Sequence, residues 1–142
     1  MSTTMPKAQE ISRKWYILDA AGKPLGRVAV VAANILRGKI KPDFAPNVDC
    51  GDHVIIINCK DAVLTGKKLE QKYYRWHTGW IGGLKEIKYA DLMKSNPEKA
   101  MTYAVTGMLP NNTLGRNSAT RLRTYAGSEH GHQAQKPEVY EF

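Results

Sequence analysis

The sequence predicts an α/β domain in which the first two strands are parallel neighbours. Two runs rich in aromatic and aliphatic residues, Trp15–Leu18 and His53–Asn58, are typical of β-strands. The segment between them, residues 25–37, instead repeats its apolar residues at helical spacing. A strand, a helix and a second strand in this order form a βαβ unit, which joins parallel strands.

Each element of this unit has a defined beginning and end in the sequence. The turn Ala20–Gly22 ends the first strand, and Pro24 suits the first turn of a helix, where its missing N–H removes no hydrogen bond. Gly38 is a typical helix stop. The second strand is aliphatic without interruption, which indicates burial on both faces of a parallel sheet. The positions that define the helix face are Leu25, Val28, Ala29, Ala32, Ala33 and Leu36.

The later elements are less regular. We predict that residues 62–65 pair as a strand with residues 72–76 across a basic loop at residues 66–71. The glycines at 79, 82 and 83 can allow positive φ in a turn and, compatibly with that role, can let the backbone approach a phosphate–sugar chain closely. We further predict helices at 89–95, at 97–106 before Gly107 and at about 117–122, and a last strand at 123–125.

The length of 142 residues fits one domain. We divide the chain into a polar N-terminal extension (1–14), a single α/β domain (15–126), for which the charge pattern described below predicts RNA binding, and an extended C-terminal tail (127–142). The longest apolar stretches fall far short of the ~20 residues that a membrane helix needs. The first ten residues lack the apolar core of a secretory signal, and two cysteines indicate no disulfide framework. The sequence therefore predicts a cytoplasmic protein without a membrane segment.

The charge of the chain is strongly basic, with 21 Lys and Arg against 13 Asp and Glu. Such a balance attracts a polyanion, either nucleic acid or an anionic membrane surface. Its distribution favours nucleic acid, because residues 13–42 contain seven basic residues and one acid, and residues 99–128 contain no carboxylate. Between residues 73 and 80, aromatic rings alternate with cations, a composition that can neutralise phosphates and stack on unpaired bases.

We expect RNA contacts on two main surfaces. The first is the basic-aromatic surface, defined by Lys67, Lys68, Lys72, Tyr74, Arg75, His77 and Lys85. The second is the arginine surface, defined by Arg116, Arg121 and Arg123. Arg121 and Arg123 are two positions apart, so they would share a face of an extended chain. For Arg116 an alternative to RNA contact is that it caps the preceding helix or pairs with a carboxylate. Further cations expected to contact phosphate are Lys23, Arg27 and Lys39.

The residues do not predict a metal, a cofactor or a catalytic centre. Residues 19–27 stand where a phosphate-binding loop would stand, but they lack both G-x-G-x-x-G and Gly-Lys-Ser/Thr. His130, His132 and Glu129 are one group of possible metal ligands, and residues 49–53 are another, where turn formation and burial explain the side chains equally well. His77 or His130 could act as a general acid or base, which leaves a nucleotide-dependent or RNA-cleaving enzyme as an alternative.

Several separate motifs resemble the bacterial large-subunit ribosomal protein L-thirteen family. They occur in the order of that family, from about Trp15 to the C-terminus, and Trp80 stands where relatives often have a histidine. The motifs are Trp15-Tyr16, Ala21–Arg27, Leu36–Lys39, Val48–Asp52, His77–Gly83, Gly107–Pro110, Leu114–Arg116 and Tyr125–His130.

The resemblance implies a three-layer α/β/α sandwich with a small, mostly parallel sheet, basic loops and extended termini. It also implies a structural constituent of the large ribosomal subunit, without a cofactor, that binds ribosomal RNA, lies beside other large-subunit proteins and supports early assembly. Since the same basic residues could bind another RNA, a regulator that acts outside the ribosome on messenger RNA is the alternative to this ribosomal role.

Overall fold

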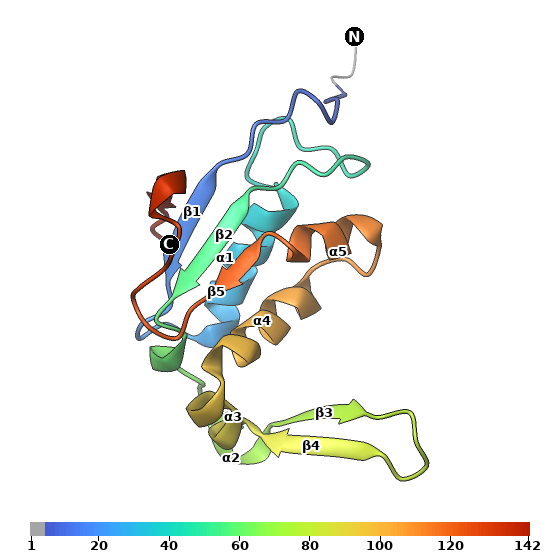
Figure 1. The fold of residues 1–142 in the computed structure, drawn as a ribbon, viewed down its shortest axis with the longest axis vertical. Helices are drawn as coiled ribbons and strands as arrows, with labels where there is room; N and C mark the ends of the chain where they lie inside the picture. The colour runs from blue at the N-terminus through green and yellow to red at the C-terminus, as the bar shows by residue number, and fades with distance from the viewer. Residues whose placement is uncertain (1–4) are drawn as a thin grey trace.

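The computed structural model describes residues 5–142, so the first four residues of the predicted N-terminal extension lie outside the described residues. Figure 1 shows a sheet backed by helices and a separate two-stranded hairpin that projects from one end. The strands of the main sheet lie in the order β5-β2-β1-β6, and all three neighbouring pairs are parallel. They are β1 (Trp15–Asp19), β2 (His53–Ile57), β5 (Leu122–Thr124) and β6 (Glu138–Val139).

The predicted βαβ unit is confirmed. β1 and β2 pair in parallel from Trp15 opposite His53 to Asp19 opposite Ile57, and α1 (Leu25–Arg37) connects them. Gly38 ends α1 in the left-handed conformation, at φ 82°, and its N–H donates to the carbonyl oxygens of Asn34 and Ile35. A side chain there would approach the backbone carbonyl carbon of Cys50 to 2.8 Å, so glycine is required by both conformation and space.

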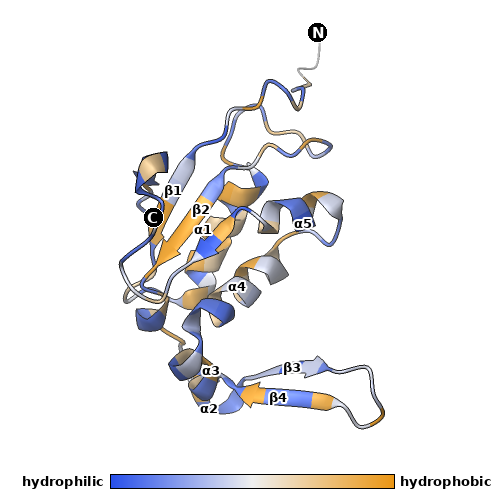
Figure 2. Cartoon of the chain, viewed as in Figure 1, coloured by the Kyte–Doolittle hydropathy of each residue, from blue (hydrophilic) through white to orange (hydrophobic). Residues whose placement is uncertain are grey.

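The core lies between one face of the main sheet and the helices α1 and α4 (Pro97–Met108). β2 is apolar along most of its length, as Figure 2 shows, and its central residues are fully buried. The largest buried side chains of this core are Leu18, Val28, Ile35, Leu36, Val54, Ile56, Met101 and Val105. The α/β fold class with a mostly parallel sheet is therefore confirmed.

The C-terminal tail adds to this sheet. β6 pairs with β1, and the Tyr140 ring meets the Tyr16 ring edge-on at 5.7 Å. Earlier in the tail, His132 lies 5.2 Å from the ring of Trp15, which is itself stacked on His53 at 4.2 Å. The extended tail is thus held against the first strand rather than lying free.

The predicted pairing of residues 62–65 with residues 72–76 is wrong. β3 (Tyr73–His77) pairs with β4 (Leu84–Lys88) in an antiparallel hairpin, while Val63 makes an isolated bridge to Pro24. The chain reverses after His77 because the loop contains two glycines at positive φ, Gly79 and Gly82. Residues 68–71, expected in a loop, form the short helix α2 (Lys68–Gln71).

The helices of the second half are mostly as predicted. α3 (Tyr89–Ser95) is confirmed, and α4 begins at Pro97 as expected but continues through Gly107 to Met108. It ends there because Leu109 precedes a proline, a position that disfavours helical conformation.

The next helix, α5 (Thr113–Ala119), begins four residues earlier than predicted. The reason is that the Asn112 side chain caps it by accepting a hydrogen bond from the Gly115 N–H at 2.8 Å.

Candidate nucleic-acid interface

The basic-aromatic surface follows the projecting hairpin and the helix α2 before it. Its cations and His77 are exposed, and Tyr74 is half-buried against Tyr103 of α4. Arg75 forms an ion pair with Glu86 of the opposite strand at 2.9 Å, with both side chains about half exposed. An exposed pair of this kind contributes little free energy, so the guanidinium is available to exchange its partner for a phosphate.

His77 lies at the beginning of the hairpin turn. Its Nδ1 accepts a hydrogen bond from the Gly79 N–H at 2.9 Å, which fixes the ring to the turn. Among residues 5–142, no carboxylate or hydroxyl group hydrogen-bonds to its ring. General acid–base catalysis by this residue would lack an orienting partner.

The arginine surface is only partly exposed. Arg116 lies on the outside of α5, and its guanidinium reaches only the Thr113 hydroxyl, at 3.3 Å, within the same helix. Arg123 is exposed on β5, with one nitrogen donating to the backbone carbonyls of Thr120 and Leu122. Neither residue pairs with a carboxylate in the part of the chain that the structure describes.

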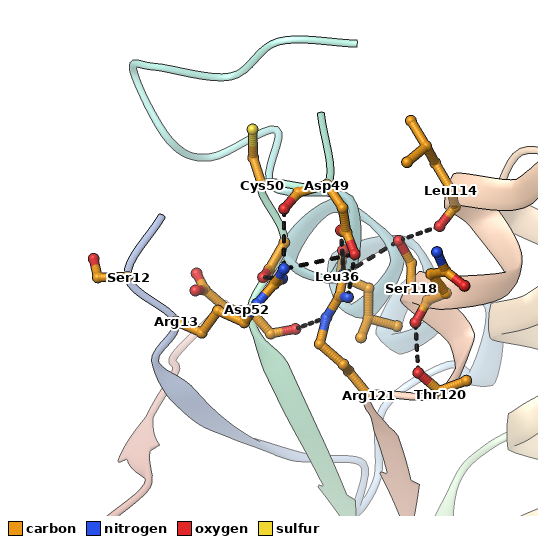
Figure 3. A network of polar contacts seen from close by, with 12 residues as sticks. Ser12, Arg13, Leu36, Asp49, Cys50, Asp52, Leu114, Ser118, Thr120 and Arg121 are labelled. Carbon is orange, nitrogen blue, oxygen red and sulfur yellow. Dashed lines mark hydrogen bonds and ion pairs between the residues drawn. The ribbon is translucent and has the colours of Figure 1, made fainter. Parts of the chain in front are cut away.

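The expectation that Arg121 shares an exposed face with Arg123 is wrong. Arg121 is only 8% exposed, and its guanidinium forms a two-pronged ion pair with Asp49 at 2.5 and 2.6 Å (Figure 3). It also donates to the carbonyl of Leu36 at 2.9 Å. Arg121 precedes β5 rather than lying within it, so its side chain turns inward to a carboxylate 72 positions away in the sequence. Arg121 is therefore not part of the candidate interface.

Around this pair lies a wider network that holds the chain before β1. Arg13 donates to the Gly51 carbonyl at 2.6 Å, and the Lys14 N–H donates to Asp52 at 2.9 Å. The same Asp52 oxygen binds the Lys41 ammonium at 2.9 Å. Together with the pair at Arg121, these contacts connect residues 13–14, the loop after α1 and the segment before β5 (Figure 3).

The electrostatics of Asp49 follow from this network. Burial acts to raise the pKa of Asp49, but the hydrogen bonds and charge of Arg121, with the charge of Arg13, outweigh it and lower the pKa below its ordinary value. The carboxylate therefore stays ionised and contributes to internal pairing rather than to a metal site.

The remaining predicted contacts lie near the two ends of α1, with Lys23 and Arg27 at its N-terminal end and Lys39 just after its C-terminal end. Arg27 and Lys39 are exposed, and the Lys23 ammonium lies 3.8 Å from the centroid of the Phe142 ring. The N–H groups of Leu25 and Arg27 already donate to the carbonyls of Val63 and Pro24. The turn therefore does not offer the free N–H cluster of a nucleotide-binding loop.

The two surfaces lie apart. The hairpin precedes α3 and α4, whereas α5 follows α4, so the surfaces flank opposite ends of a 12-residue helix that spans about 18 Å (Figure 1). A partner that contacts both surfaces must be extended over at least that distance, as a folded RNA is.

Three further residues lie at the hairpin or beside it and were not among the predicted contacts. Trp76 is 43% exposed on β3, and Tyr103 of α4 stacks on Tyr74, with Lys99 beside it. For Trp76 the signal was the alternation of rings and cations in residues 73–77. Lys99 begins the carboxylate-free stretch of residues 99–128. For Tyr103 no local signal existed, because its stacking partner Tyr74 belongs to another part of the chain.

The described residues form neither a metal site nor a membrane-spanning helix. Within residues 5–142, no three His, Cys, Asp or Glu side chains come together as a metal ion requires. Two of the possible ligands at residues 49–53 have internal partners: Asp49 pairs with Arg121, and His53, the first residue of β2, stacks on Trp15. No helix in this part of the chain is both long and apolar enough to cross a membrane.

Comparison with known proteins places these features in a family. The family described as ribosomal protein L13 matches residues 13–131. The large ribosomal subunit protein uL13 of Ruminiclostridium cellulolyticum is 60% identical over 139 residues, which cover 98% of this chain and 96% of that protein. The uL13 protein of Carboxydothermus hydrogenoformans is 60% identical over 141 residues, covering 99% of each chain. That of Clostridioides difficile is 54% identical over 142 residues, covering 100% and 99%. The chain therefore belongs to the ribosomal protein L13 family.

Proposed function

We propose that the protein is a structural constituent of the large ribosomal subunit that binds ribosomal RNA and supports early subunit assembly. The observation that carries the proposal is the match over nearly the full length of both chains to proteins named as large ribosomal subunit proteins. The exposed cations of the hairpin and of α5 agree with it, because a polyanion is their natural partner. As a ribosome constituent, the protein acts in the cytoplasm.

The proposed mechanism is electrostatic. Lysine and arginine side chains on the hairpin and on α5 neutralise phosphates where RNA segments converge, and they release the counterions that those phosphates held. The rigid α/β core keeps the two surfaces at a fixed separation. The protein therefore recognises the shape of folded RNA and the positions of its phosphates more than base sequence.

The proposal also specifies the molecules that the protein contacts. A constituent of the large subunit contacts ribosomal RNA and other large-subunit proteins. None of the relatives compared is named for binding messenger RNA, so a role on messenger RNA is not part of the proposal. A structural role also agrees with His77, which is bound to its own turn rather than to a catalytic partner.

Arg116 tests the proposal at a single residue. Replacing Arg116 by alanine is expected to leave thermal stability nearly unchanged, because exposed substitutions usually alter it by less than about 0.5 kcal/mol, and to lower incorporation into large subunits. Arg116→Lys is expected to weaken incorporation as well, since lysine keeps the charge but loses the planar fork that binds two phosphate oxygens.

Lys60→Ala is the matched control, because it removes one exposed positive charge outside both surfaces. Incorporation is measured in cells that express tagged variants beside the wild type. Loss of stability with normal incorporation would show that Arg116 only supports α5.

A further inference from the structure

Three aromatic rings form a ladder that runs from the core to the exposed hairpin. We call Tyr103, Tyr74 and Trp76 the ring ladder. Tyr103 of α4 and Tyr74 of β3 stack at 4.0 Å with an angle of 9° between their planes. Trp76 follows at 5.6 Å from Tyr74, with an angle of 25°. Because Tyr103 belongs to a helix packed in the core, the ladder fixes the plane of an indole that is itself 43% exposed.

The outer end of the ladder is open. Side chains alternate between the two faces of a strand, so the next position on the face of Trp76 is Thr78, and across the turn lies Gly83. These two residues are joined by a hydrogen bond from the Thr78 N–H to the Gly83 carbonyl at 3.0 Å. A side chain at position 83 would collide with the Thr78 hydroxyl at 2.0 Å, so this position carries no side chain that could cover the end of the ladder.

The charge around the ladder is positive. Lys85 is the residue directly opposite Trp76 on β4, and Lys99 lies 5.6 Å from the centroid of the Tyr103 ring at the inner end. The acid of the hairpin, Glu86, lies on the other face, where it is bound by Arg75. An aromatic face bordered by lysines matches a nucleotide, which presents a planar base and a phosphate together.

We propose that Trp76 is a stacking platform for one unpaired base of ribosomal RNA, with Lys85 neutralising the phosphate beside that base. The proposal rests on the proposed function and adds a mode of contact to it. Tyr74 and Tyr103 hold the indole in place before binding, which reduces the entropy lost when the base stacks. Stacking tolerates any base, because every base has a π-face.

The exposed tip of the same hairpin suggests a different kind of partner. Trp80 is 79% exposed and Ile81 is 95% exposed, so the tip could enter an apolar pocket of a neighbouring protein. The lysines and the open end of the ring ladder favour RNA as the partner of the face at Trp76. The experiment separates the two partners.

The test compares Trp76→Leu with Trp76→Phe in binding to protein-free large-subunit RNA at fixed salt and magnesium. Leucine keeps the apolar volume but removes the π-face, so we expect affinity to fall about tenfold, in the range measured for loss of one stacked base. Phenylalanine keeps the π-face and is expected to retain affinity within about twofold. Indole emission gives a second measurement, since stacking on a base quenches the part of the signal that Trp76→Phe lacks.

Two control variants complete the test. Lys85→Ala is expected to reduce the slope of log affinity against log salt by about 0.7–0.9, whereas Trp76→Leu leaves that slope unchanged. Wild-type affinity in Trp76→Leu, or no quenching of Trp76 on binding, would overturn the proposal. So would a finding that Ile81→Ala, and not Trp76→Leu, lowers incorporation into subunits, because the hairpin then docks on a protein. A wild-type protein that binds no ribosomal RNA would instead overturn the proposed function.

Discussion

Replacing Arg121 by alanine is expected to lower the free energy of unfolding by about 3–5 kcal/mol, the usual loss when one partner of a buried ion pair is removed. The guanidinium makes two hydrogen bonds to Asp49 and further ones to the carbonyls of Leu36 and Asp52. Without it, the Asp49 carboxylate keeps only the more distant charge of Arg13, at 3.7 Å, and the two backbone carbonyls lose a donor inside the protein. Urea unfolding followed by circular dichroism measures the difference.

Arg123→Ala is the matched control, because it removes the same side chain from an exposed position two residues away. We expect a change of about 1 kcal/mol or less there. A loss below about 1 kcal/mol in Arg121→Ala would contradict the structural role assigned to the buried pair.

The pH dependence of stability gives a second measurement of the same pair. Since the pKa of Asp49 is lowered in the folded protein, its contribution to stability is present above the unfolded pKa of about 3.9 and is lost as the pH falls through the folded value. Arg121→Ala is expected to reduce this acid sensitivity.

The affinity for large-subunit RNA is expected to fall about 10³-fold when salt rises from 50 to 200 mM, if six phosphates are contacted. The hairpin with α2 and the arginine surface together present seven exposed cations: Lys67, Lys68, Lys72, Arg75, Lys85, Arg116 and Arg123. Each phosphate that they neutralise adds about 0.7–0.9 to the slope of log affinity against log salt. Filter binding or fluorescence titration at four or more salt concentrations measures the slope.

A second experiment tests whether binding requires a metal ion held by the protein. The protein is dialysed against a chelator, and its affinity for RNA folded in magnesium is compared with that of untreated protein. We expect unchanged affinity, because no described side chains gather into a metal site. Affinity that is independent of salt, or that is lost after chelation of the protein, would contradict an interface built on cations and phosphates.

The βαβ unit could be predicted because its signals are local. The helical spacing from Leu25 to Leu36, the stop at Gly38 and the aliphatic run in β2 each depend on residues close in sequence. The partner of β3 could not be predicted in the same way. Residues 62–65 and residues 84–88 both flank it, and the choice depends on the glycine loop and on packing against α3 and α4.

In the candidate interface, too, local sequence predicts some features and long-range contacts decide the others. A basic composition predicts that cations bind a polyanion. It does not show which cations form ion pairs inside the protein and are therefore not available to RNA. Arg121 lies in a segment without carboxylates, and its partner Asp49 is brought to it only by the parallel pairing of β2 with β5. Arg116 and the lysines of the hairpin region remain exposed, because no carboxylate among residues 5–142 pairs with them.

The measurement that tests the central proposal most directly is sedimentation of a cell lysate through a sucrose gradient, with the protein quantified in each fraction. Membership of the large subunit predicts one copy for each large subunit, in the free large-subunit and whole-ribosome fractions, and removal only at high salt. The protein remaining at the top of the gradient, or sedimenting in substoichiometric amounts with messenger RNA, would contradict a structural role in the ribosome.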